Sequence, residues 1–249
     1  MTLIDFYKET AALIRQDLKK QKMLLPPESL AELCASHCRT HRNTAAALRK
    51  KTAYLSVLQK AYPGEGVVIS DFDHLERAKQ LENLVQVIAV NTEKYFFNGS
   101  ASMLTSVSHM VKNPIVRWDF IIDSYQIGQS RLWGADAVRL VTALLDQSEL
   151  REFTAAAAEH GLEVIIEINS PEEFERLRAL DDLFYIVYLN GGNWSVDSVT
   201  AVLQQIPANT PALLNIASFE QCDVAVDAFV LDQARFSTAD GIEKIKKSR

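Results

Sequence analysis

The chain opens with a helical pattern and then alternates between short apolar runs and amphipathic segments. Apolar residues recur at helical spacing over residues 2–22, and a second short helix is expected after the turn at Pro26 and Pro27, with Ser29 as its N-cap. Eight β-prone runs follow, at residues 53–58, 85–90, 114–118, 137–142, 163–168, 184–189, 212–215 and 228–231. The segments between them have helical patterns, and two of these open with acidic residues, as the helix dipole favours.

This alternation predicts an α/β fold with parallel strands. Strand, helix and strand in repetition imply right-handed crossovers within one sheet. Eight such repeats favour a closed barrel over an open doubly wound sheet, and the chain contains no G-x-G-x-x-G or Walker lysine motif. We therefore predict a (β/α)8 TIM barrel that forms a single domain over residues 1–249, with residues 1–50 as an N-terminal helical extension.

Composition narrows the possible partners. A chain of 249 residues with 48% hydrophobic content can bury a full core, and its net charge of −6 without a basic stripe argues against nucleic acid. No apolar run approaches the roughly 20 residues that span a bilayer, and the first residues lack the layout of a signal peptide. Three cysteines form no disulfide framework. We expect a cytoplasmic protein that acts on a small molecule without nucleic acid or membrane; a homodimer or a pathway protein partner is possible.

One stretch has the residue types of a metal site. "CASHCRTH" places Cys34, His37, Cys38 and His41 on one face of a predicted helix. The first and last of them lie about 10 Å apart along the helix axis at 1.5 Å per residue, which is too far for a tetrahedral zinc site. We expect a half-packed helix face, no metal and no cofactor.

Four segments carry a resemblance to a known family. "NTEKYFFNGS", "DFIIDSYQI", "GADAV" and "GLEVIIEINSPEEFERL" are similar to segments of indole-3-glycerol phosphate synthase, the barrel enzyme of tryptophan biosynthesis, and the similarity extends over nearly the whole chain. The resemblance implies closure of a carboxyphenylamino-deoxyribulose phosphate to an indole ring with loss of carbon dioxide and water. That reaction needs an ammonium as proton donor, a second cation, carboxylates and a phosphate cradle.

Two strand ends depart from the family pattern. The E-x-K-x-x-S-P-S pattern of the first strand corresponds to residues 57–64, where Gln59 replaces the lysine and Tyr62 replaces the serine. The K-D-F tripeptide of the third strand, whose lysine is the family's catalytic acid, reads Trp118 to Phe120. The resemblance therefore implies that the central proton donor is missing here.

Two family positions persist, and the phosphate cradle changes. Glu167 corresponds to the fifth-strand glutamate, an acid/base or electrostatic residue, and Asn190 matches the first asparagine of N-N-R, whose arginine is missing. Asp232 follows the eighth strand, close to the expected phosphate position. Two like charges a few ångströms apart cost several kcal/mol at low dielectric, so we expect phosphorylated ligands to bind poorly.

Arg139 is the candidate that replaces the missing cation. By spacing from Trp118 it falls where the family has an apolar residue beside the glutamate, and an arginine inside a barrel is expensive unless paired. We expect an ion pair with Glu167, with Trp118 as a cation–π partner. The predicted catalytic residues are thus Glu167, Asn190 and Arg139, and the predicted substrate-binding residues are Trp118, Tyr62, Phe120, Tyr188 and Gln59. This pocket suits a planar organic ligand, including one whose carboxylate Arg139 grips.

Simple structural roles are the alternatives. Trp118 and Tyr62 can fill a closed cavity, since aromatic burial is favourable. A one-residue shift in register would turn Arg139 outward, toward a crossover helix. Asn190 is also a good turn residue.

Three functions remain open. The first is a repurposed cyclase, lyase or isomerase of specialised metabolism that acts on a non-phosphorylated, aromatic or amino-acid-derived molecule, with Glu167 as acid or base. The second is a non-catalytic relative that binds a ligand or a partner. The third is the ordinary synthase reaction. We rank the redirected enzyme first; an open polar pocket would favour it, and a filled one would favour binding.

Overall fold

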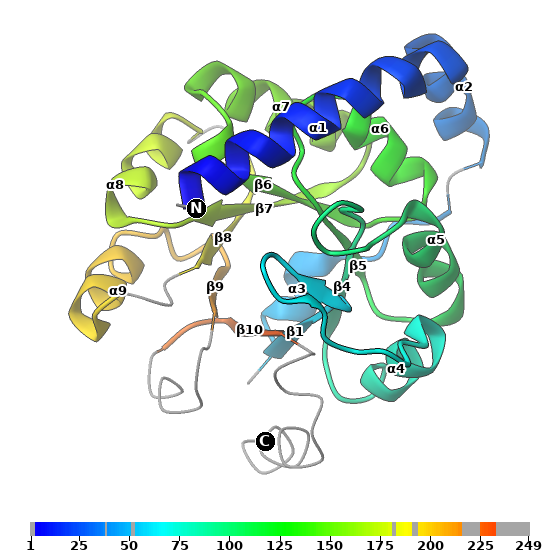
Figure 1. Cartoon of the computed structure of the whole chain (residues 1–249). Helices are drawn as coiled ribbons and strands as arrows, with labels where there is room; N and C mark the ends of the chain where they lie inside the picture. The colour runs from blue at the N-terminus through cyan, green and yellow to red at the C-terminus, as the bar shows by residue number, and fades with distance from the viewer. Residues whose placement is uncertain are drawn as a thin grey trace.

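Parallel strands close into a barrel at the centre of the molecule (Figure 1). The computed structural model describes residues 3–37, 39–50, 53–180, 183–190, 194–215 and 225–232. Within these residues the barrel has the order β1-β10-β9-β8-β7-β6-β5-β4, which confirms the predicted (β/α)8 fold. The strands are β1 (Ala53–Leu58), β4 (Val87–Asn91), β5 (Ile115–Trp118), β6 (Ala137–Val141), β7 (Glu163–Ile168), β8 (Ile186–Leu189), β9 (Ala212–Asn215) and β10 (Ala228–Asp232).

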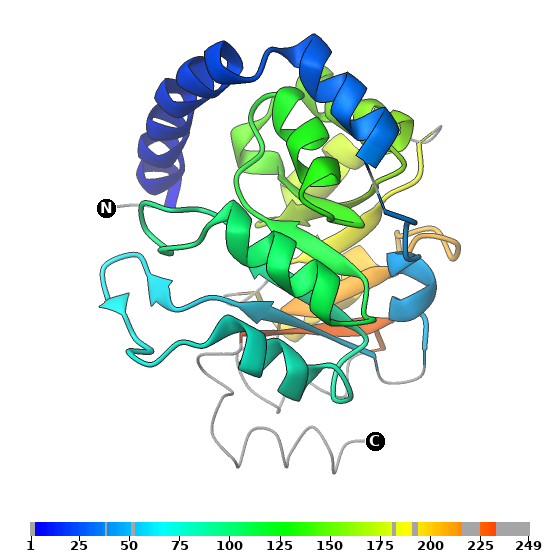
Figure 2. The ribbon, with the colours of Figure 1, turned by 90° about the vertical axis from the view of Figure 1, so that its right-hand side faces the viewer.

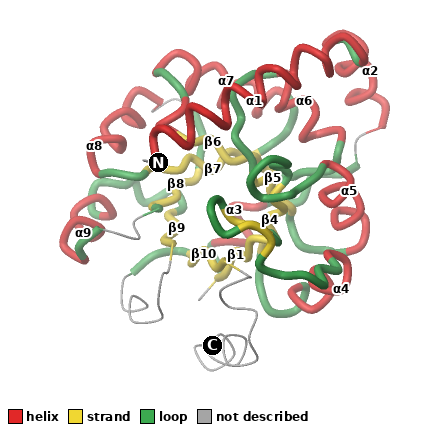
Figure 3. The backbone as a smooth tube through the Cα atoms, viewed as in Figure 1, coloured by secondary structure: helices red, strands yellow, loops and turns green. Residues whose placement is uncertain are grey.

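Helices surround this barrel, as the ring of helices around the strands in Figure 3 shows. The N-terminal extension contributes α1 (Leu3–Leu24), α2 (Pro27–His37) and α3 (Thr44–Leu48). The crossovers contain α4 (His74–Leu81), α5 (Ala101–Met110), α6 (Tyr125–Leu132), α7 (Gln147–Glu159), α8 (Pro171–Phe174) and α9 (Val196–Leu203), with 3-10 turns η1 (Thr142–Leu144) and η2 (Glu175–Leu180). Within the described residues, no helix combines the length and the apolar character needed to cross a bilayer.

Two local details differ from the sequence prediction. Helix α2 begins at Pro27, so Ser29 lies inside the first turn and is not the N-cap; proline is well suited to a first helical position because its φ is already helical. The loop after β1 contains an antiparallel hairpin, β2 (Ala61–Tyr62) and β3 (Gly66–Val67), which the alternation did not predict.

The barrel strands are buried on both faces, which explains why they read as continuous apolar runs. One face packs outward against the helices, and the alternate residues fill the barrel interior. Ala137 of β6 belongs to the cluster that fills the barrel interior. Because side chains alternate along a strand, Arg139, two residues further on, faces the interior as well. A one-residue shift in register is therefore excluded for β6.

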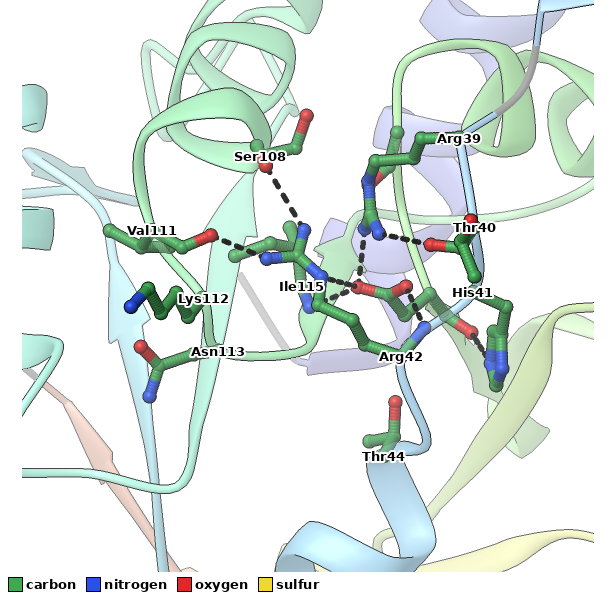
Figure 4. A network of polar contacts seen from close by, with 12 residues as sticks. Arg39, Thr40, His41, Arg42, Thr44, Ser108, Val111, Lys112, Asn113 and Ile115 are labelled. Carbon is green, nitrogen blue, oxygen red and sulfur yellow. Dashed lines mark hydrogen bonds and ion pairs between the residues drawn. The ribbon is translucent and has the colours of Figure 1, made fainter.

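A buried carboxylate joins the extension to the amino ends of the strands. Asp136, immediately before β6, is 0% exposed and forms ion pairs with Arg39 and Arg42 (Figure 4). Its oxygens also accept the backbone N–H of Arg42 at 2.7 Å and that of Ile115 at 2.8 Å. Arg42 in turn donates to carbonyl groups after α5 and within it. One side chain thus connects the α2–α3 linker, β5 and β6. Figure 2 shows the blue helices α1 and α2 at the outside of the molecule, where α2 packs against α6.

The substitution Asp136→Asn tests this connection. Removing the charge leaves two guanidinium groups around a neutral amide, and breaking a buried ion pair costs about 3–5 kcal/mol. Both arginine side chains are 20% exposed, so solvent screening should reduce this cost to about 2–4 kcal/mol in urea unfolding. The charge-matched control Glu152→Gln, on the exposed face of α7, should change stability by less than about 0.5 kcal/mol. Equal stability of the two variants would contradict the assigned role.

Candidate functional site

The carboxyl ends of the barrel strands form the mouth of the barrel, and α1 crosses it (Figure 1). In a (β/α)8 barrel this end carries the ligand-binding side chains. Residues of α1 contact a side chain within β7 and one that follows β5: Tyr7 reaches Glu167, and Phe6 packs on Phe120. The mouth therefore combines barrel residues with residues of the N-terminal extension.

The expected ion pair between Arg139 and Glu167 is present. Nη1 of Arg139 lies 3.2 Å from Oε2 of Glu167, and the two side chains are 9% and 1% exposed. They come from adjacent strands, since β6 pairs with β7 in parallel. Each charge is costly to bury alone, so each stabilises the other in this position.

Two aromatic rings hold the guanidinium. The central carbon of Arg139 lies 4.6 Å from the ring centroid of Trp118 and 5.0 Å from that of Phe120. Nη2 also donates to the carbonyl of Asp119 at 3.3 Å. Trp118 contacts Tyr188 at a centroid distance of 5.4 Å. The large ring at the end of β5 thus packs against the arginine and a second aromatic side chain, both of which are buried.

Side-chain amides extend the site toward β8 and β9. Asn190 donates from Nδ2 to Oε1 of Glu167 at 3.0 Å and to Oδ1 of Asn169 at 3.1 Å. Its Oδ1 accepts from Asn215 at 2.8 Å and from the hydroxyl of Tyr188 at 3.4 Å. Asn190 is therefore a bridging residue and not only a turn residue. Asn169 and Asn215 were missed from the sequence, although an asparagine at the end of β9 or just after β7 was a usable signal.

Tyr7 of α1 covers the site next to Glu167. Its hydroxyl donates to Oε1 of Glu167 at 3.3 Å, and its ring packs on Phe120 at 5.6 Å. Burial and the nearby Glu167 carboxylate raise the pKa of Tyr7 well above its usual range, so the phenol stays a neutral donor. No feature of the sequence pattern singles out Tyr7 among the positions of α1.

These side chains do not exhaust their hydrogen-bonding capacity within the described residues. Nε of Arg139, Oε2 of Glu167 and Nδ2 of Asn169 are buried without a hydrogen-bond partner there, although Oε2 has the ion pair. A buried polar atom without a partner costs about 1–3 kcal/mol. The site therefore retains two donors and one acceptor that a ligand group could satisfy after a local shift.

Two predicted substrate-binding residues lie on the β1 side of the barrel. Gln59 is buried at the end of β1 and accepts from Nδ2 of Asn91 at 3.0 Å. Tyr62 is buried in β2, opposite Gly66 of the hairpin. The ion pair and the hydrogen bond that join Arg139, Glu167 and Asn190 are made without either residue.

The phosphate cradle lies largely outside the described residues. Asp232 is the last residue of β10 and pairs with Val57 of β1, but its side chain is among the parts not described. The same holds for Gly191 and Gly192 after β8 and for the segment after Asn215. The expectation for phosphate therefore stays a prediction.

The prediction that Cys34, His37, Cys38 and His41 share one helix face is wrong for His41. Helix α2 ends at His37, so His41 does not continue its face. Nε2 of His41 lies 3.5 Å from Glu163, whereas Sγ of Cys34 contacts the carbonyl of Gly128. Cys38 and the side chain of His37 lie outside the described residues, and among the others no cluster of metal-binding side chains forms.

The substitution Tyr7→Phe tests the contact from α1. It removes one hydrogen bond and keeps the ring, so a loss of about 1 kcal/mol is expected at neutral pH. Because the folded pKa is raised above the ordinary value of 10.0, the unfolded chain loses the proton first, and stability falls as the pH rises above about 10. Urea unfolding at neutral pH and between about pH 10 and 11 should show a smaller alkaline loss in the variant than in the parent. Identical alkaline losses would contradict the contact.

The amino-acid sequence is similar to those of known proteins. A sequence profile described as indole-3-glycerol phosphate synthase matches residues 7–190. A protein of that name from Campylobacter jejuni is 30% identical over 233 residues, which cover 88% of this chain and 90% of the relative. Another from Caldanaerobacter subterraneus is 33% identical over 197 residues, with 78% and 76% covered.

Solved structures share the barrel at low sequence identity. KGPDC from Streptococcus mutans has a TM-score of 0.57 and 10% identity, with 79% of this chain and 99% of that chain covered. The N-acetylmannosamine-6-phosphate 2-epimerase from Clostridium perfringens has a TM-score of 0.55 and 12% identity, with 80% and 93% covered. These likenesses concern the fold alone. By its sequence relatives, the chain belongs to the indole-3-glycerol phosphate synthase family.

Proposed function

We propose that this chain is a ligand-binding member of the family that does not close the indole ring. Its mouth would take a small, planar, non-phosphorylated molecule of aromatic or amino-acid origin. The observation that carries the proposal is the internal ion pair: Glu167 is bound by Arg139 of the same chain, and Trp118 stands where the resemblance places the family's lysine.

The residues at this position lack the acid that ring closure needs. The reaction requires a group that gives a proton to a departing hydroxyl and is recharged at neutral pH. The indole of Trp118 is only a hydrogen-bond donor, and a guanidinium is not deprotonated in proteins. Arg139 therefore returns a positive charge to the site without returning a proton donor.

The charge balance favours a neutral ligand. The guanidinium of Arg139 is already neutralised by Glu167 at 3.2 Å, so a substrate carboxylate or phosphate would have to compete with that carboxylate and lie close to it. Aromatic side chains and asparagine amides surround the pair. Such surfaces suit a flat molecule that exchanges hydrogen bonds with amides.

A redirected enzyme is the second candidate. It is favoured by Oε2 of Glu167, which has the ion pair with Arg139 but accepts no hydrogen bond within the described residues and so keeps a lone pair for a proton. A cyclase, lyase or isomerase of specialised metabolism would use Glu167 in this way. Burial of Trp118, Tyr188 and Glu167, together with the cover from Tyr7, supports binding over catalysis.

The direct test uses the family substrate. Purified protein is incubated with carboxyphenylamino-deoxyribulose phosphate while indole fluorescence is followed, and thermal unfolding is measured with the same compound and with 2-aminobenzamide, a neutral planar probe. We expect no fluorescence above the buffer control and a higher Tm only with the neutral probe. The Campylobacter jejuni relative serves as the positive control for the assay. Turnover that Glu167→Gln abolishes, or stabilisation by the phosphorylated compound alone, would contradict the proposal.

A further inference from the structure

A side cavity, separate from the mouth, lies between α1, the loop from β4 to α5, and α6. It has a volume of about 250 Å³, and its apolar wall includes Ile14 and Leu18 of α1 and Trp133 after α6. Arg117 lines it from β5 and bonds to α6, whereas its neighbour Trp118 faces the barrel interior. The barrel wall thus separates the two sites. We propose that this side cavity binds a small organic amine, with Glu93 and Gln129 as the groups that receive the ammonium.

The cations that line the side cavity are already paired. Nη2 of Arg117 lies 2.8 Å from Oδ2 of Asp119, and both side chains are buried. Nζ of Lys94, at the rim, lies 2.6 Å from Oδ2 of Asp17. Neither cation therefore provides a free positive charge for an anionic ligand.

Glu93 leaves one negative charge without a cation. It is 2% exposed, and its oxygens accept the backbone N–H groups of Tyr95, Phe96 and Phe97 at 2.8, 2.7 and 3.1 Å. In the described part of the chain it forms no ion pair with any lysine, arginine or histidine. Burial raises the pKa of this carboxyl, and the nearby Asp119 carboxylate adds to the effect, so the site disfavours a further negative charge. A bound ammonium would supply that charge.

Gln129 provides a second acceptor. It is 6% exposed, and its Nε2 donates to Oε1 of Gln21 on α1 at 2.7 Å. Its Oε1 is buried and accepts no hydrogen bond within the described residues. An unpartnered buried acceptor favours a ligand that donates, and an ammonium carries three donors. The cavity is therefore lined by two acceptor groups and by no uncommitted cation.

The size of the side cavity limits the ligand to about one ring. An apolar cavity of about 150 Å³ can hold benzene. The side cavity is larger, at about 250 Å³, and Trp133 and aliphatic side chains line it together with the acceptors. A single ring with a short aminoalkyl group matches both its volume and its combination of apolar and acceptor groups.

Benzylamine is the probe for this site, with benzyl alcohol as its neutral analogue and benzoate as the anion. Calorimetry on the full chain at neutral pH should show millimolar or tighter binding of benzylamine, at least about 10-fold weaker binding of benzyl alcohol, and none of benzoate. Glu93→Gln should weaken benzylamine binding at least about 10-fold, and the control Glu152→Gln should leave it unchanged. Binding of benzylamine is measured on its own, and Glu93 is not part of the ion pair in the mouth, so this test and the ring-closure assay can fail separately.

A second variant keeps the test decisive if Glu93→Gln fails to fold. Ala101 is the first residue of α5 and lines the side cavity, so Ala101→Phe should occupy its volume and abolish binding of benzylamine. Equal affinity for benzylamine and benzyl alcohol, unchanged affinity in a folded Glu93→Gln or Ala101→Phe variant, or no binding at millimolar benzylamine would each overturn the proposal.

Discussion

The ion pair between Arg139 and Glu167 is the constraint on which the rest of the mouth depends. Both groups sit inside a barrel whose other interior residues are mainly apolar, and neither could be buried there alone. Trp118 and Phe120 cover the guanidinium, while Asn190 and Tyr7 bind the carboxylate. Each neighbour is therefore positioned by one of the two charges, and a ligand has to bind around this pair.

Helix α1 links the two candidate sites. Near its start, Tyr7 covers Glu167; further along, Ile14, Leu18 and Gln21 form one wall of the side cavity. The chain after α2 is fixed to the amino ends of the strands through Asp136. The extension is thus held at both ends of the barrel, and the orientation of α1 affects the mouth and the side cavity together.

The sequence predicted the features that depend on local pattern. Two-sided burial made each strand a continuous apolar run, and alternation along β6 placed Arg139 beside Ala137 on the interior face. Features that depend on contacts between residues far apart in the sequence could not be predicted from local pattern. Tyr7 and Asn215 gain their roles only when α1 and β9 meet β7 and β8. Likewise, α2 ends at His37, and the residues after it turn toward Asp136, a partner about a hundred positions away in the sequence.

A double-mutant cycle on Arg139 and Glu167 tests the central claim most directly. The free energy of unfolding in urea is measured for the parent, Arg139→Met, Glu167→Gln and the double variant. Each single change leaves one buried charge unpaired and should cost about 3 kcal/mol, while the double variant should cost less than the sum by at least about 1.5 kcal/mol. Losses that add to within about 0.5 kcal/mol would show that the two charges do not support each other, which would contradict the account of the mouth.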